Sequence, residues 1–382
     1  MRKSRPIILV LIMILVLLAA AAVLPLKTGA FGWRDFLSYW AASHLMVTGG
    51  NPYDLSAVDH VVQEVSPERG GTEPAWNPPW LVVALVPLGI LPYEFAARVW
   101  LLINLLLLSC LPLLIWQWLA GSSGPRPPIW LPVIGLAFAA SLIQIAIGQI
   151  TVVILLGFVL CLAGLRSGHD GWAGAALVLS FSKPHLAYLA LPMILIWAAM
   201  HRRWQVWLGL AAAALAGLIV ATVLSPAWAS SYRPALGSND FWIKLTATVG
   251  GVGRAMWGTD VFRYLGVLTW LLIPWLVRLA DQQGLLTSVN VALLISLPLA
   301  PYGWSFDQIM LLPAITQIVF WLMQTTDRDR QRIGAFSLAA IYAIMFGMKL
   351  MGLGDFFFAG VPLALGVLYA ALYLSQRGIA YA

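Results

Sequence analysis

The sequence predicts an all-α, polytopic membrane protein with about twelve transmembrane helices. Its 382 residues are 61% hydrophobic and 10% charged, whereas a soluble domain carries roughly 25% charged residues. Apolar runs that approach or reach the roughly 20 residues needed to cross a bilayer recur along the whole chain. Nineteen tryptophans and eleven tyrosines suit aromatic belts at the two membrane interfaces. We therefore expect one integral membrane domain over residues 1–382.

The expected spans follow the apolar runs in chain order. They are 7–26, 93–118, 128–147, 149–165, 171–183, 186–200, 204–224, 260–278, 285–300, 307–325, 335–351 and 358–376. The first run exceeds the roughly 7–15 apolar residues of a signal peptide, so we expect a retained span. The run 79–91 contains Pro87 and is too short to cross. We interpret it as a re-entrant or interfacial helix in the first outer loop.

The distribution of charge predicts the orientation of these spans. With the N-terminus in the cytoplasm, the cytoplasmic segments hold twelve cations and four acids, and the rest of the chain holds ten cations and eleven acids. This bias follows the positive-inside rule, which also accounts for the net charge of +7 without a nucleic-acid partner. We expect a multi-pass plasma-membrane protein with both termini cytoplasmic. The long segments 27–78 and 225–259 would then lie outside.

Two polar breaks interrupt the expected spans and suggest a cavity open to the outer leaflet. Gly148-Gln149 separates one pair of spans, and Ser182-Lys183-Pro184-His185 separates another. Non-helical backbone at membrane depth is tolerated where it lines a cavity or is buried in protein. Lys183 either extends toward the interface or holds a lipid-linked phosphate. His185 is a phosphate ligand, an acid/base group or a satisfied polar residue, and Gln149 is a hydrogen-bonding partner.

The first outer loop contains a candidate general base. Asp35 precedes an amphipathic segment, so it is either the N-cap of a surface helix or a base that takes a proton from an acceptor hydroxyl. The stretches Gly49-Gly-Asn51-Pro-Tyr53 and Trp76-Asn77-Pro-Pro-Trp80 are typical of turns. Their aromatic and amide side chains would also suit a sugar-binding surface.

The later outer segments supply cations and a further carboxylate. Arg254 and Arg263 are suited to bind phosphate in a bidentate manner, or they neutralise acids in the same loop. Asp307 begins an apolar run, so it is either an N-cap or a substrate contact. Cys110 and Cys161 lie in apolar runs and predict neither a disulfide nor a metal site.

Several motifs of other enzyme classes are missing from the sequence. It contains no G-x-x-x-x-G-K-[ST] phosphate loop, no G-x-S-x-G nucleophile elbow and no H-E-x-x-H zinc motif. Asp327-Arg-Asp329 resembles a metal-binding D-x-D, but it alternates with arginines in a cytoplasmic turn. Mutual neutralisation explains that pair better, and we expect no metal cofactor.

The outer-face motifs together resemble the GT-C class of glycosyltransferases, and most closely glycosyltransferase family 87. The stretches that carry the resemblance are Asp35 with Tyr39-Trp-Ala-Ala42, Gly49-Gly-Asn-Pro-Tyr53, Asn77-Pro-Pro79, Gly148-Gln149, Lys183-Pro184, and Pro301 to Asp307 followed by Leu311-Leu312-Pro313. Residues 1–224, with the first outer loop 27–78, are the more family-like part. Residues 225–382 contribute the second outer loop and the C-terminal helices.

The resemblance implies a GT-C fold and an inverting, metal-independent hexosyltransferase. Such an enzyme moves a sugar, typically mannose, from a polyprenyl-phosphate donor in the membrane to an extracytoplasmic lipid or glycan acceptor. The family's aspartate base maps to Asp35. Lys183, His185, Arg254 and Arg263 would bind the donor phosphate. The residues expected to bind sugar or acceptor are Tyr39, Asn51, Tyr53, Asn77, Gln149 and Asp307. The alternative function is a membrane transporter or a flippase for lipid-linked sugars.

Overall fold

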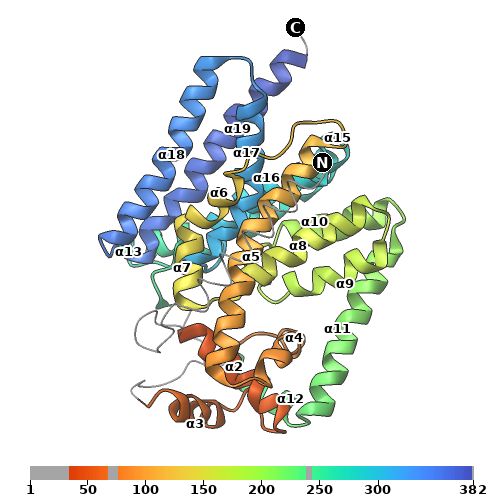
Figure 1. Cartoon of the computed structure of the whole chain (residues 1–382), viewed down its shortest axis with the longest axis vertical. Helices are drawn as coiled ribbons and strands as arrows, with labels where there is room; N and C mark the ends of the chain where they lie inside the picture. The colour runs from red at the N-terminus through yellow and green to blue at the C-terminus, as the bar shows by residue number, and fades with distance from the viewer. Residues whose placement is uncertain (1–33, 68–75, 238–242, 381–382) are drawn as a thin grey trace, which may run out of the picture. The chain divides into compact units, whose positions relative to one another are not determined.

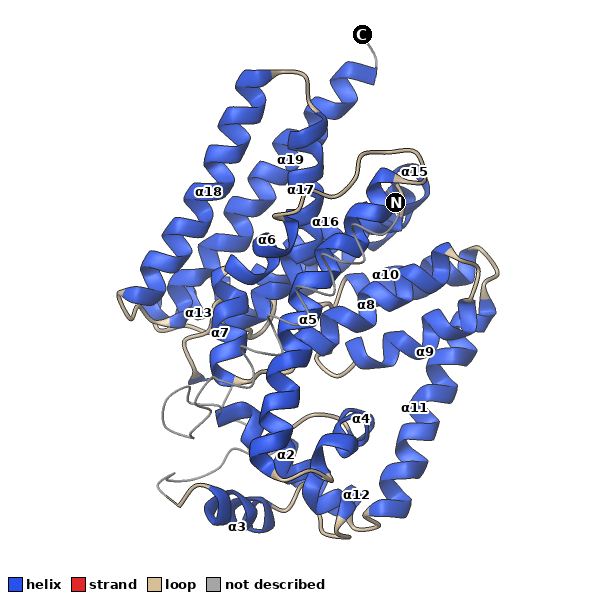
Figure 2. Cartoon of the chain, in the orientation of Figure 1, coloured by secondary structure: helices blue, strands red, loops and turns tan. Residues whose placement is uncertain are grey.

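The computed structural model describes residues 34–67, 76–237 and 243–380, and within these ranges every regular element is a helix (Figure 2). The predicted all-α class is therefore confirmed. The expected first span, 7–26, lies outside the described residues. Contacts group the chain into two compact units, which we call unit 1 (Met1–Cys110, Gln144–Val152 and Ala214–Asn239) and unit 2 (Leu111–Ile143, Val153–Ala213 and Asp240–Ala382). The organisation of the chain as one domain stays a prediction.

Six helical segments of the described residues are long and apolar enough to cross a membrane. They are Tyr93–Ala120, Trp204–Leu224, Val261–Gln283, Ser305–Gln324, Arg328–Leu350 and Asp355–Gln376. Four apolar helices are shorter: Pro79–Gly89, Thr151–Arg166, Ala190–Met200 and Leu285–Leu299. At 1.5 Å per residue none of these four reaches the roughly 30 Å of a bilayer core by itself. The length and apolar composition of these helices indicate a membrane protein. The total of about twelve spans stays a prediction.

Unit 1 is built around the helix that follows the first expected span. Its helices are α2 (Arg34–Val47), α3 (Leu55–Val65), α4 (Pro79–Gly89) and α12 (Trp228–Gly237), with parts of α5 (Tyr93–Ala120), α7 (Ala139–Ile147), α8 (Thr151–Arg166) and α11 (Trp204–Leu224). A buried apolar cluster joins α2, α4, α11 and α12; its members are Ala42, Met46, Tyr53, Val82, Ala221 and Ala235.

The segment 79–91 forms the short helix α4, as its length and Pro87 predicted. α4 packs closely against α2, because a Cβ on Gly89 would lie 2.6 Å from the Ser43 carbonyl carbon. Two α2 side chains bond the end of α4: Trp40 Nε1 donates to Leu91 O at 3.0 Å, and His44 Nδ1 lies 2.9 Å from Gly89 O. Whether α4 is re-entrant or interfacial stays a prediction.

Unit 2 packs its helices around α16 (Leu285–Leu299), which is buried along most of its length. The surrounding helices include α10 (Ala190–Met200), α15 (Ile273–Gln283), α17 (Leu312–Gln324), α18 (Arg328–Leu350) and α19 (Gly360–Ala380). The last three run side by side (Figure 1). Three helices share a buried polar contact, since Gln317 Oε1 accepts from Asn290 Nδ2 at 2.7 Å and from Tyr369 OH at 2.6 Å. Such bonds hold helices together where lipid offers no water.

The remaining unit 2 elements are short. They are α6 (Leu131–Ala137), α9 (Asp170–Ser180), α13 (Val249–Trp257) and α14 (Leu265–Leu268), and the 3₁₀ helices η1 (Pro184–Leu186), η3 (Val261–Tyr264), η4 (Thr269–Leu272), η5 (Ser305–Leu311) and η6 (Asp355–Ala359). The expected span 128–147 is two helices, α6 and α7, interrupted at Phe138, where the backbone is extended.

Candidate functional site

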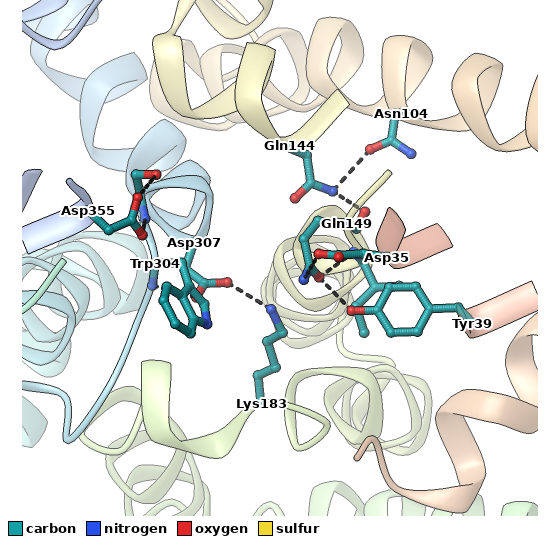
Figure 3. Close-up of polar contacts among 11 residues, drawn as sticks. Asp35, Tyr39, Asn104, Gln144, Gln149, Lys183, Trp304, Asp307 and Asp355 are labelled. Atoms are coloured by element: carbon teal, nitrogen blue, oxygen red, sulfur yellow. Dashed lines mark hydrogen bonds and ion pairs between the residues drawn. The ribbon is translucent and has the colours of Figure 1, made fainter. Parts of the chain in front are cut away.

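Asp35 lies in the first turn of α2, and its carboxylate contacts the break between α7 and α8. Gln149 Nε2 donates to Asp35 Oδ2 at 2.8 Å, and Tyr39 OH donates to Gln149 Oε1 at 2.9 Å (Figure 3). Tyr39 follows Asp35 by four residues, so both side chains lie on one face of α2. Three of the residues predicted from sequence therefore meet in unit 1.

The backbone of the break is held in place by buried side chains of the neighbouring helices. Gly148 has φ +70°, a left-handed conformation that favours glycine. Trp100 of α5 donates to Gly148 O at 3.0 Å, and Gln144 of α7 donates to Gln149 O. Gln144 also donates to Asn104 Oδ1 at 3.1 Å. These contacts fix the point from which the Gln149 side chain extends.

The Gly-Gly-Asn-Pro-Tyr stretch packs against α12 within unit 1. Asn51 Nδ2 donates to Ser231 Oγ at 2.8 Å, and the Tyr53 ring lies 4.7 Å from the Tyr232 ring between centroids. Tyr53 OH donates to Asn77 O at 2.8 Å, and burial raises the pKa of this phenol above its ordinary value. Asn51, Tyr53 and Asn77 thus fasten the segments before and after α3 to the rest of unit 1. Their binding of sugar stays a prediction.

Lys183 and Asp307 form a buried ion pair in unit 2. Lys183 Nζ lies 2.8 Å from Asp307 Oδ1, and the two side chains are 10% and 1% exposed (Figure 3). The ammonium also lies 5.0 Å from the centroid of the Phe306 ring. The second carboxylate oxygen of Asp307 accepts from Trp304 N at 3.0 Å, as in a capping box. Asp307 therefore has two roles at the same time: it caps η5 from its first turn, and it pairs with Lys183.

The turn before η5 is held on one side by Asp355 at the start of η6. Its two carboxylate oxygens accept from Ser305 N at 3.0 Å and from Ser305 Oγ at 2.8 Å. On the other side Arg263 donates to Pro301 O at 2.7 Å. Asp307 thus lies in η5, whose first residue is bonded to Asp355 and whose preceding turn is bonded to Arg263.

Arg254 and Arg263 bond to groups of unit 2 itself. Arg254 and Arg263 both pair with Asp260, the second at 2.9 Å. Arg263 is 2% exposed and also donates to Lys244 O at 2.8 Å. The alternative in which these arginines neutralise their own loop accounts for these bonds. Phosphate binding by Arg254 and Arg263 stays a prediction.

His185 lies in η1, two residues after Lys183, and its ring packs against a residue of the same turn that carries Asp307. The centroids of the His185 and Tyr302 rings are 4.0 Å apart. Beyond His185, an apolar groove is lined by Phe181, Pro184, Tyr188, Leu191, Pro192, Leu195 and Trp270. Lys183 and His185 thus connect the second polar break to the stretch 301–307.

Comparison with protein families decides the class of this protein. The model of glycosyltransferase family 87 matches residues 76–301, which is more than half of the chain. The chain belongs to glycosyltransferase family 87. No curated protein and no solved structure matches it. The predicted family is therefore confirmed, and the protein is a glycosyltransferase.

The family 87 match includes some candidate residues and excludes others. It contains Asn77, Gln149, Lys183, His185, Arg254 and Arg263. Asp35 and Asp307 lie outside it, although each bonds to a residue inside it, namely Gln149 and Lys183. Among the described residues no group of three or more His, Cys, Asp or Glu side chains is arranged to hold a metal ion. Metal independence stays a prediction for this family 87 enzyme.

The residues that support Asp35 and Asp307 were not predicted from the sequence. Asn104 and Gln144 are polar residues inside apolar runs, and Asp355 is a single acid at the start of one. Polar groups within membrane segments are costly, so such positions are candidates by default. The signal was present for all three residues, but it did not indicate their partners.

Proposed function

We propose that this glycosyltransferase is an inverting enzyme that uses a polyprenyl-phosphate-linked sugar as donor. The acceptor is a hydroxyl of a lipid or glycan on the extracytoplasmic side of the plasma membrane, with both termini of the enzyme in the cytoplasm. Mannose is the sugar that the family resemblance favours. Membership of glycosyltransferase family 87 supports the transferase chemistry, and the apolar helices support a donor carried by the membrane.

The proposed reaction needs one base and one leaving group. The acceptor oxygen attacks the anomeric carbon from the face opposite the phosphate, and its proton passes to the Asp35 carboxylate. The bond between the anomeric carbon and the phosphate oxygen breaks, and its electron pair stays on that oxygen. Polyprenyl phosphate leaves, and the anomeric configuration inverts. A positioned carboxylate base contributes roughly 10²–10⁴-fold to such a step.

Lys183 is proposed to bind the donor phosphate, with His185 as a further contact. An ammonium is a compact point charge that suits phosphate, and Lys183 is an almost fully buried cation next to the late outer turn. Charge that develops on the leaving phosphate is stabilised best by a cation fixed in a site from which water is excluded. This cation would replace a metal ion, which the proposed mechanism does not need.

The observation that carries the proposal is the fixed orientation of Asp35. Its carboxylate accepts a hydrogen bond from the Gln149 amide. In the sequence, Asp35 follows the first expected span, 7–26. A hydrogen bond to the charged form of a carboxylate stabilises that form, which is the form a general base requires. A helix-capping role alone would not require a partner 114 residues away along the chain.

The test uses the full-length protein in vesicles that contain polyprenyl-phosphate mannose labelled in the sugar. Transfer is expected to release unlabelled polyprenyl phosphate and to place the label on an added lipid or glycan acceptor with the opposite anomeric configuration. Label that crosses the membrane without covalent change would instead identify a flippase. Retention of the anomeric configuration in the product would exclude the single-displacement mechanism.

A further inference from the structure

The Gln149 side chain is bonded at both ends of its amide. Its Oε1 accepts from Tyr39 OH at 2.9 Å and from Ile150 N at 2.8 Å, and its Nε2 donates to Asp35 Oδ2 at 2.8 Å. Gln149 is 7% exposed. An amide bonded in this way has little freedom to rotate, because any rotation breaks at least one buried hydrogen bond.

The partners also determine which way the amide points. The Ile150 N–H can only donate, so the atom facing it must be the amide oxygen. The amide nitrogen then faces Asp35, whose ionised carboxylate can only accept. The amide oxygen can only accept, so the Tyr39 hydroxyl must donate to it. A directed series of hydrogen bonds therefore runs from Tyr39 through Gln149 to Asp35.

The series is anchored to rigid parts of unit 1. The carbonyl groups of Gly148 and Gln149 accept from Trp100 and Gln144, as described above. Phe36, the residue after Asp35, stacks on Trp100 with ring centroids 5.4 Å apart. α2 is thus fastened to α5 beside the carboxylate, and the peptide that carries Gln149 is fastened to α5 and α7.

We propose that Tyr39 and Gln149 are positioning residues that orient the Asp35 carboxylate for proton transfer. The proposal rests on the proposed role of Asp35 as the base. It differs from the expectation that Tyr39 and Gln149 bind sugar or acceptor directly. Removal of a positioning residue lowers the rate of the chemical step. Removal of a substrate contact that is equally strong in the ground state and the transition state changes KM instead.

The test compares Tyr39→Phe and Gln149→Leu with the wild-type enzyme in the transfer assay. Tyr39→Phe removes one hydroxyl and leaves the ring in place, so the fold is retained. Misplacement of a reacting group by about 1 Å can cost about 100-fold in rate, and we expect kcat to fall by roughly 10–100-fold in each variant. KM for donor and acceptor and the Kd of the donor should not change.

A double variant and a control sharpen the test. If Tyr39 acts only through Gln149, then Tyr39→Phe should have no further effect in the Gln149→Leu background. Tyr342→Phe is the matched control, because it also removes a part-buried tyrosine hydroxyl, one that donates to Ile134 O at 3.0 Å. This control should keep the wild-type kcat.

The outcomes separate this inference from the proposed function. A rise in KM with unchanged kcat would identify direct substrate contacts and overturn the positioning role. Unchanged kinetics in Tyr39→Phe, or independent effects of the two substitutions, would also overturn it. If Asp35→Asn loses turnover while Tyr39→Phe does not, only the positioning role fails. If Asp35→Asn retains turnover, the proposed base itself is rejected.

Discussion

The two polar clusters of this protein are held together by different interactions. In unit 1, Asp35 is oriented by the neutral side chains of Gln149 and Tyr39. In unit 2, the charged side chains of Lys183 and Asp307 bind each other directly, and a second carboxylate, Asp355, holds the same turn. Figure 3 shows each set of bonds. In one cluster an amide bonds the Asp35 carboxylate, and in the other an ammonium bonds the Asp307 carboxylate.

This difference predicts how each cluster responds to substitution. Removal of one partner from a buried ion pair leaves a charge without compensation, and that is strongly destabilising. Removal of one hydrogen bond to the Asp35 carboxylate costs about 1.5–3 kcal/mol of the free energy of folding, which is less than the loss expected for the ion pair. We therefore expect substitutions in unit 2 to lower stability and activity together. Substitutions around Asp35 should lower activity with a smaller effect on stability.

The largest effect on stability is expected for Lys183→Met. The variant leaves the 1% exposed Asp307 carboxylate without its cation, so the free energy of unfolding should fall by about 3–5 kcal/mol. The measurement is thermal unfolding in detergent or nanodiscs. The double variant Lys183→Met/Asp307→Leu should regain most of the stability, because an apolar pair can replace a buried ion pair. It should still fail to bind the donor.

Two results would contradict this account of the ion pair. Donor binding by the double variant at wild-type affinity would remove Lys183 from the phosphate site and leave the pair with a structural role alone. If Lys183→Met unfolds at the wild-type temperature, the ion pair does not contribute the stability expected of a buried pair. Arg332→Gln, which breaks an exposed pair with Asp329 at 3.9 Å, is the control and should unfold like the wild type.

A smaller loss is expected for Asp355→Asn. The amide keeps one acceptor oxygen, so one of the two bonds to Ser305 is lost together with the charge. A hydrogen bond to a charged group is worth about 1.5–3 kcal/mol, and we expect a loss of about 2 kcal/mol in the free energy of unfolding. Thermal unfolding measures it. Equal stability of Asp355→Asn and wild type would show that Asp355 does not hold the turn.

Gly148→Ala should have the smallest effect on stability and still lower turnover. Gly148 has φ +70°, and a residue with a Cβ costs about 1–2 kcal/mol in that conformation. Any relaxation of this backbone moves Gln149 and, through it, Asp35. Gly168→Ala is the matched control, since Gly168 has φ +76° and open space around the added Cβ. It should lose similar stability and keep wild-type turnover. A parallel loss of turnover in both variants would contradict the comparison.

The helices of this protein could be predicted from the sequence because most are continuous apolar runs. The run 204–224 coincides with α11, and the run 93–118 differs from α5 by two residues at its end. The interruptions were less predictable. The run 128–147 is as apolar at Phe138 as elsewhere, so its division into α6 and α7 depends on packing, which periodicity does not report.

The candidate residues could be predicted singly, but their partners could not. Asp35 and Gln149 are 114 residues apart, and Lys183 and Asp307 are 124 residues apart. No local spacing indicates contacts of that separation, because they depend on how the helices pack. The cost of a charge in a membrane segment identified Lys183. That cost gives no indication that the Asp307 carboxylate binds the Lys183 ammonium.

The rate of transfer by Asp35→Asn tests the central claim most directly. Asparagine keeps the size of the side chain and can still accept a bond from Gln149, but it cannot take the acceptor proton. We expect kcat to fall by roughly 10²–10⁴-fold, with wild-type donor Kd and unfolding temperature. The control is Asp54→Asn, because Asp54 caps α3 in the same unit and asparagine caps equally well. Near-normal transfer by Asp35→Asn would contradict the claim that Asp35 is the base.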